Sequence, residues 1–172
     1  MPTTMSLTDT VYLLPGHGGA LDKGLGEGLL HRGLNVIGRE TRGDFLRLPL
    51  REQVDVIRRD IERNFWDARG RIIANSYGAY LFLHAQSGME PFPGKVLLLS
   101  PVVGYAVNEQ IRTSNYPAPL NCQIHVGSED WQANPNEVQV LGARLGASVY
   151  VVEGRGHMLG REYVSGVLDE WL

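Results

Sequence analysis

The sequence has little of several features that mark particular protein classes. It has one cysteine, Cys122, so it can form neither a disulfide framework nor a cysteine-based zinc site. No apolar run approaches the roughly 20 residues of a membrane helix, and residues 1–10 lack the basic start and apolar core of a signal peptide. The net charge is only −3 and no basic patch stands out, so neither nucleic acid nor a membrane is an expected partner. We therefore expect a cytoplasmic protein.

What the sequence does contain is a set of short apolar runs rich in Val, Ile and Leu. They lie at residues 11–14, 34–37, 71–74, 96–100, 123–126 and 148–152. Most are continuous rather than alternating, as in parallel strands that are covered on both faces. Segments with helical spacing of apolar residues separate most of them. This alternation predicts an α/β fold of three layers, doubly wound around a six-stranded, mainly parallel sheet.

The chain length fits a single domain over residues 1–172, with residues 1–10 as a flexible N-terminus. Asn134, Pro135 and Glu137 have the spacing of an N-cap, a first helical residue and a capping-box glutamate, and Gly146 is placed to end that helix. The least secure helix is 21–32, because each of its glycines costs about 1 kcal/mol relative to alanine.

In a doubly wound sheet, the loops after the strands build the site. The third run is followed by Ala74-Asn75-Ser76-Tyr77-Gly78, which matches the nucleophile elbow G-x-S-x-G with alanine at the first position. The elbow lifts a serine hydroxyl above the sheet, and small neighbours let the strand and helix approach closely. The alternative is that Ser76 only caps the helix 77–86.

The fifth and sixth runs are followed by the other two groups of a possible triad. Glu129 and Asp130 both carry a carboxylate that could orient an imidazole, although a solvated acidic turn is the alternative. His157 lies in a glycine-rich loop and could act as a general base, since imidazole titrates near neutral pH. The alternative interpretation is that His157 is an exposed loop histidine without a catalytic role.

The first run is followed by the glycine-rich turn Pro15-Gly16-His17-Gly18-Gly19. An oxyanion hole needs two backbone N–H donors, and in this type of site one comes from the residue after the nucleophile. Tyr77 is therefore the first candidate and Gly19 the second. We interpret His17 as a residue that shapes this loop, and as the second choice for the base.

These motifs follow different strands in the order Ser, Asp, His, which distinguishes one serine-hydrolase fold from the others. The sequence resembles the α/β-hydrolase superfamily from residue 11 to the C-terminus, through His17-Gly18-Gly19, the Ser76 motif, Gly127-Ser128-Glu129-Asp130 and Gly156-His157. Without the two leading antiparallel strands of larger members, it is most similar in length and layout to small lidless serine hydrolases of the retinoblastoma-binding-protein-9 type.

The resemblance implies the catalytic set Ser76, Asp130 and His157, because the family pattern selects Asp130 over Glu129. It places the second oxyanion donor at Gly19. It also implies that Ser76 attacks an ester or thioester, forming an acyl-enzyme that water hydrolyses, with no metal or cofactor required. The expected partner is thus a small-molecule substrate; the oligomeric state is not predicted.

About twenty residues separate the fourth and fifth runs, too few for a helical lid domain. We therefore expect an open or shallow pocket. Candidate wall residues, for which ordinary packing is an equal alternative, are His17, Val102, Tyr105, Tyr116, Trp131 and Met158.

Three other functions stay open. Gly16-His17-Gly18 with Glu40 after the second run has some likeness to a dinucleotide fingerprint, but Leu21 occupies its third small position. The chain could also be a non-catalytic interaction module on a hydrolase scaffold. Finally, the same site could perform acyl transfer.

Overall fold

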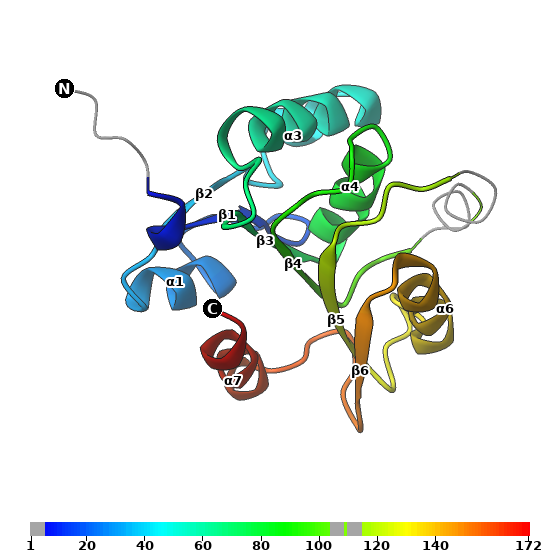
Figure 1. The fold of residues 1–172 in the computed structure, drawn as a ribbon. Coiled ribbons are helices and arrows are strands. Elements are labelled where there is room, and N and C mark those ends of the chain that lie inside the picture. Colours follow the sequence, from blue (N-terminus) through cyan, green and yellow to red (C-terminus); the bar gives the residue numbers. More distant parts are fainter. Residues whose placement is uncertain (1–5, 104–108, 110–114) are drawn as a thin grey trace.

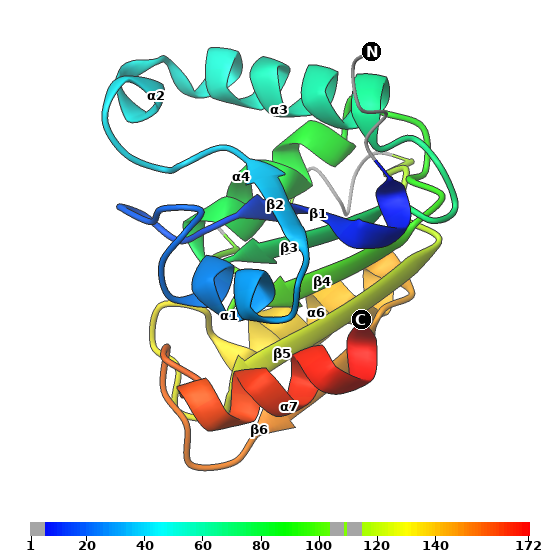
Figure 2. The ribbon, with the colours of Figure 1, turned by 90° about the vertical axis from the view of Figure 1, so that its left-hand side faces the viewer.

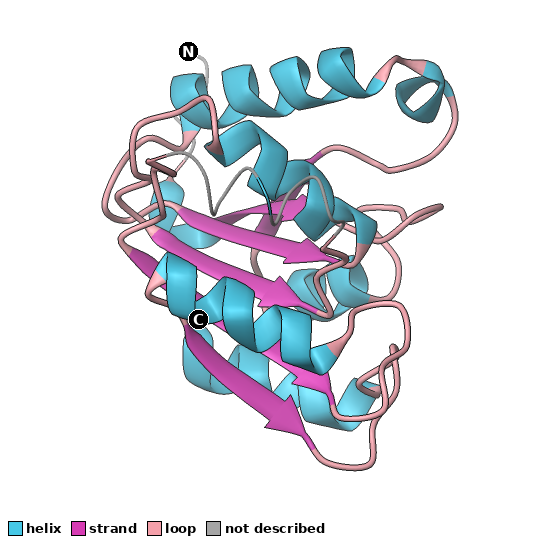
Figure 3. Ribbon diagram, turned by 90° about the vertical axis from the view of Figure 1, so that its right-hand side faces the viewer, coloured by secondary structure: helices cyan, strands magenta, loops and turns pink. Residues whose placement is uncertain are grey.

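The computed structural model describes residues 6–103, 109 and 115–172. Its centre is a six-stranded sheet in the order β2-β1-β3-β4-β5-β6, in which every neighbouring pair is parallel. The arrows in Figure 3 accordingly run in one direction. Each apolar run forms a strand, as predicted: β1 Thr10–Leu14, β2 Asn35–Gly38, β3 Arg71–Asn75, β4 Lys95–Leu99, β5 Asn121–Gly127 and β6 Ser148–Val152.

Helices cover both faces of the sheet (Figures 1 and 2). One face carries α1 Leu25–His31 and α7 Arg161–Trp171, and the other carries α3 Leu50–Asn64, α4 Tyr77–Gln86 and α6 Pro135–Leu145. Two further short elements are the 3-10 helix η1 Leu7–Asp9 and the helix α2 Asp44–Arg47. The predicted three-layer, doubly wound α/β fold is confirmed.

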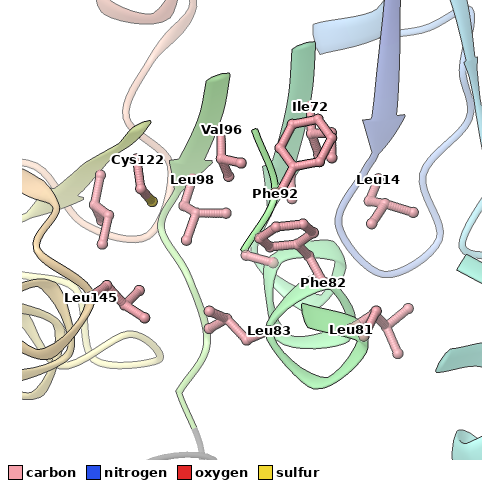
Figure 4. Close-up of a cluster of buried hydrophobic side chains, with 14 of the residues drawn as sticks. Leu14, Ile72, Leu81, Phe82, Leu83, Phe92, Val96, Leu98, Cys122 and Leu145 are labelled. Atoms are coloured by element: carbon pink, nitrogen blue, oxygen red, sulfur yellow. The ribbon is translucent and has the colours of Figure 1, made fainter. Parts of the chain in front are cut away.

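Alternate residues of the central strands enter two separate cores. In β1, Tyr12 and Leu14 pack with the face covered by α3, α4 and α6, part of which Figure 4 shows, whereas Val11 and Leu13 pack with α1 and α7. All residues of β1 are buried, which explains why this run has no alternation. The edge strands β2 and β6 are only partly buried.

The ends of several elements follow local signals. The Asn134 side chain accepts hydrogen bonds from the N–H groups of Asn136 and Glu137 at 2.9 and 3.3 Å, and Gly146 ends α6 at φ 64°, as predicted. The flexible N-terminus expected over residues 1–10 does not extend to residues 7–10, because Leu7 begins η1 and Thr10 is a fully buried residue of β1; residues 1–5 lie outside the described part of the chain. Among the described residues, no helix is both long and apolar enough to span a membrane.

The order of the strands fixes where loops can meet. The chain leaves β1 toward β2 at one side and returns to β3 at the other, so the sheet has a switch point between β1 and β3. The loops that follow β1 and β3 flank a crevice at such a point, which is where ligands bind in open α/β sheets. The turn 15–19 and Ser76 therefore lie together at this edge.

Candidate active site

Ser76 occupies a strained turn between β3 and α4. Its backbone has φ 52° and ψ −114°, a conformation that few non-glycine residues adopt. A Cβ at Gly78 would lie 2.1 Å from the Leu14 carbonyl oxygen, so position 78 of the elbow has no room for any residue larger than glycine. The Ser76 side chain makes no capping hydrogen bond, so the helix-cap alternative is wrong.

The Ser76 hydroxyl begins a row of hydrogen-bonded side chains. Its Oγ lies 2.8 Å from Nε2 of His157. On the other side of the ring, His157 Nδ1 lies 2.9 Å from Oδ2 and 3.1 Å from Oδ1 of Asp130. Because a carboxylate only accepts, Nδ1 carries the proton and Nε2 is left free to accept the serine hydroxyl.

Asp130 is held rigidly at the end of this row. It is 3% exposed, and its Oδ1 also accepts the N–H groups of Gln132 and Ala133 at 2.9 and 2.8 Å. Glu129, the other carboxylate considered from the sequence, is exposed. The structure thus brings Asp130 to the histidine, whereas no hydrogen bond joins Glu129 to it among the described residues.

Ser100 holds the His157 loop and was not identified from the sequence. It follows β4 with φ 46°, is 1% exposed, and donates its hydroxyl to the His157 carbonyl oxygen at 2.9 Å. A Cβ at Gly127 would lie 2.2 Å from the Arg155 carbonyl oxygen, so the loops after β5 and β6 also press together. The only sequence signal for Ser100 was its position at the end of an apolar run.

The expectation that the Gly19 N–H is the second oxyanion donor is wrong. This N–H donates to the Gly16 carbonyl at 2.9 Å and to Thr41 Oγ1 at 3.2 Å, so it is not free to bind an oxyanion. The amide of His17 has no acceptor among the described residues. Gly16, which precedes it, lies against Ser76: a Cβ on Gly16 would be 3.5 Å from the Ser76 Cβ.

Thr41, which sequence analysis also missed, fastens this turn from the loop after β2. It is fully buried, and its hydroxyl donates to the Gly16 carbonyl while accepting the Gly19 N–H. Its backbone adds two bonds: the Thr41 carbonyl accepts the Gly18 N–H at 2.7 Å, and the Thr41 N–H donates to Gly19 at 3.2 Å. One buried residue therefore sets the conformation of the turn.

The second amide near Ser76 is that of Tyr77. As the first residue of α4, it has an N–H without an acceptor inside the helix. The Tyr77 phenol donates to Gln53 Oε1 at 2.9 Å, and its ring lies edge-on to the His17 ring at 5.9 Å. The residues that carry the two amides thus lie side by side next to Ser76.

The other expected wall residues have varied surroundings. Trp131 and Met158, which directly follow Asp130 and His157, are each 83% exposed. Val102 is half-buried, and its N–H donates to the Ser76 carbonyl at 3.4 Å. Tyr116 packs on the core and donates its hydroxyl to the Leu83 carbonyl at 2.7 Å. Tyr105 lies outside the described residues.

The structure also bears on the dinucleotide alternative. Glu40 Oε2 accepts the Leu21 N–H at 2.9 Å, and Oε1 accepts a bond from Arg42 at 3.1 Å. This carboxylate therefore braces the loop after β1, a role that leaves it poorly placed to bind a ribose. Within the described part of the chain, His, Cys, Asp and Glu side chains nowhere gather in a group that could hold a metal ion.

Two other histidines lie within regular secondary structure, His125 in β5 and His84 in α4. His125 is 3% exposed and bonds through Nδ1 to the Tyr163 hydroxyl at 2.6 Å. Burial lowers its pKa to about 4. Burial also lowers the pKa of His84 in α4. Both remain neutral at physiological pH and lie apart from the Ser76 row.

Comparison with solved structures identifies the architecture. A predicted CIB-like hydrolase from Thermoplasma acidophilum matches at 16% identity with a TM-score of 0.69, covering 99% of this chain and 87% of its own. A putative YdeN-like hydrolase from Pectobacterium atrosepticum matches at 19% identity and 0.68, covering 94% and 89%. The thioesterase RedJ of Streptomyces coelicolor matches at 15% and 0.66, covering 96% and 91%.

Sequence comparison is less informative, because no protein-family model and no curated protein sequence matches this chain. The structural likeness nevertheless extends over nearly its whole length. The all-parallel sheet, its flanking helices and these neighbours together show that the chain has the α/β-hydrolase fold.

Proposed function

We propose that this protein is a serine hydrolase that cleaves a carboxylic ester or thioester through an acyl-enzyme on Ser76. The observation that carries the proposal is the continuous row from Ser76 Oγ through His157 to Asp130, with contacts of 2.8 and 2.9 Å. An esterase and a thioesterase among the structural neighbours support this class of reaction.

In the first half of the reaction, Ser76 Oγ attacks the carbonyl carbon while its proton passes to His157 Nε2. The imidazolium that forms is stabilised by the Asp130 carboxylate, which already bonds Nδ1. His157 then gives the proton to the departing alkoxide or thiolate, leaving the acyl group on Ser76. In the second half, His157 takes a proton from water, which attacks the acyl carbon. The bond to Ser76 Oγ then breaks, His157 returns the proton to that oxygen, and the acid is released.

The negative charge on the carbonyl oxygen needs two donors that are in place before the reaction. We assign them to the N–H groups of Tyr77 and His17, in place of the pair Tyr77 and Gly19 expected from the sequence. The support is that the Gly19 N–H is already bonded, whereas His17 follows the glycine that packs on Ser76. One such donor is typically worth about 2.7–4 kcal/mol in the transition state.

Hydrolysis of p-nitrophenyl acetate and of an acetyl thioester tests the proposal. Ser76→Ala and His157→Ala should each reduce kcat by a factor on the order of 10⁵–10⁶ with the fold intact by circular dichroism. Ser87→Ala, at the distant end of α4, is the matched control and should retain activity within about twofold. Equal activity in wild type and Ser76→Ala would refute the assignment.

A further inference from the structure

A groove of about 480 Å³ lies between α1 and α7, beside His157. Its size falls in the usual range for small-molecule sites, roughly 300–1,000 Å³. Figure 2 shows the two helices on the same face of the sheet. The space exists because α1 has only seven residues and because Gly28 presents no side chain to it. A Cβ on Gly28 would meet only the Arg32 Nη1 atom, at 3.6 Å.

The walls of the groove are mainly apolar. The aliphatic residues that line it are Leu25, Leu99, Leu159, Val164 and Leu168. The guanidinium group of Arg32, which lines the groove, already has hydrogen-bond partners. It donates to Asp169 at 2.8 Å, to the Ser165 carbonyl and hydroxyl at 3.0 and 2.8 Å, and to the Gly28 carbonyl at 2.9 Å. The remaining charged lining residues, Glu27 and Arg161, are exposed to solvent. The interior therefore suits an uncharged hydrocarbon chain.

We propose that this groove binds the alcohol or thiol portion of the substrate as a hydrocarbon chain, an inference that rests on the proposed hydrolase function. His157 must hand its proton to the leaving oxygen or sulfur, so that atom lies next to Nε2. His157 and the two residues after it form part of the groove wall. A chain on the leaving atom continues along this wall.

A chain on the acyl side begins elsewhere. The acyl carbon is bonded to Ser76 Oγ in the intermediate, and Ser76 is not among the described residues that line the groove. The groove therefore discriminates between alcohols or thiols and is indifferent to the acid. Burying one methylene is worth about fourfold in binding. The value of kcat/KM should rise by about that factor for each carbon added to the alcohol until the groove is full.

Two glycines offer a matched pair of variants. Gly28→Leu adds a side chain that enters the groove from α1. Gly166→Leu makes the same change in α7, where a Cβ meets nothing within 4 Å and the residue does not line the groove. Neither glycine has a positive φ, and leucine is the better helix former, so both variants should fold.

Two ester series then separate the alcohol side from the acyl side. For alkyl acetates from methyl to octyl, wild type and Gly166→Leu should show the rise with alcohol length, and Gly28→Leu should lower the ratio of kcat/KM for octyl acetate to that for methyl acetate at least tenfold. For ethyl esters from acetate to octanoate, all three proteins should behave alike. The proposal is overturned if Gly28→Leu leaves the alkyl acetate series unchanged, or if it selectively impairs the octanoate.

Binding of 1-octanol by calorimetry tests the groove without catalysis. Wild type and Gly166→Leu should bind it, and Gly28→Leu should bind at least tenfold more weakly. Equal affinity in all three, or no binding to wild type, overturns the proposal. If octanol binds as expected but no ester is hydrolysed, the proposed hydrolase function fails while the groove is retained as a site for apolar alcohols.

Discussion

Replacing Thr41 with valine tests whether the turn after β1 is a preorganised part of the site. Valine keeps the shape of threonine but removes the hydroxyl that donates to the Gly16 carbonyl and accepts the Gly19 N–H. An unsatisfied buried group costs about 1–3 kcal/mol, so the free energy of unfolding should fall by that order. If the turn shifts and the His17 N–H no longer reaches the oxyanion, kcat should fall by about 10²–10³.

The assay is ester hydrolysis with kcat and KM measured separately, together with inhibition by a trifluoromethyl ketone that mimics the tetrahedral intermediate. In Thr41→Val, kcat and inhibitor affinity should fall together while KM changes little, and Thr41→Ser should retain both. Thr10→Val is the control, since Thr10 is fully buried and its hydroxyl donates to the Ser6 carbonyl at 2.7 Å, the one acceptor that it has in the described part of the chain. If Thr41→Val and Thr10→Val lose similar stability and both keep full kcat, the turn 15–19 does not contribute to catalysis.

Three further predictions concern other buried groups. Asp130→Asn should lower kcat by about 10³–10⁴ because it disturbs the histidine tautomer, and Glu129→Gln should change it by less than about twofold; the reverse order would reject the assignment of the acid. Burial raises the pKa of Cys122 to about 12, so Ellman's reagent should label this thiol only after denaturation, and rapid native labelling would contradict its burial. His125 has its folded pKa lowered to about 4, so the unfolded chain binds a proton that the folded one does not between that value and about pH 6.5. Stability should therefore be lost as pH falls through this window, by at most about 3 kcal/mol, and urea midpoints of His125→Gln should show a smaller loss.

The strands were predictable because their chemistry is local. Residues 11–14, 72–74 and 96–99 are apolar throughout, and only a sheet covered on both faces buries such strands completely. Positions of candidate site residues followed from the same fact, since the carboxyl ends of parallel strands share one edge. Ser76, His157 and the acidic pair Glu129 and Asp130 could therefore be named as neighbours from the order of the strands. The choice of Asp130 from that pair came from the family resemblance.

The details that escaped prediction depend on contacts between distant segments. Which amide of the glycine-rich turn is free depends on the turn's conformation, and Thr41 fixes it from a loop more than twenty residues away. No feature of the sequence predicted the hydrogen bond from Ser100 to the His157 loop. The groove arises from the packing of α1 against α7, where the absent side chain of Gly28 matters more than any side chain present.

The central claim is that Ser76 is an activated nucleophile, and covalent labelling tests it most directly. Native protein treated with a fluorophosphonate should gain one adduct by intact mass, located on Ser76 by peptide mapping. The adduct should form much more slowly in His157→Ala, because the hydroxyl there has no base 2.8 Å away. Absence of labelling in the folded wild-type protein, or an adduct on another residue that persists in Ser76→Ala, would contradict the account.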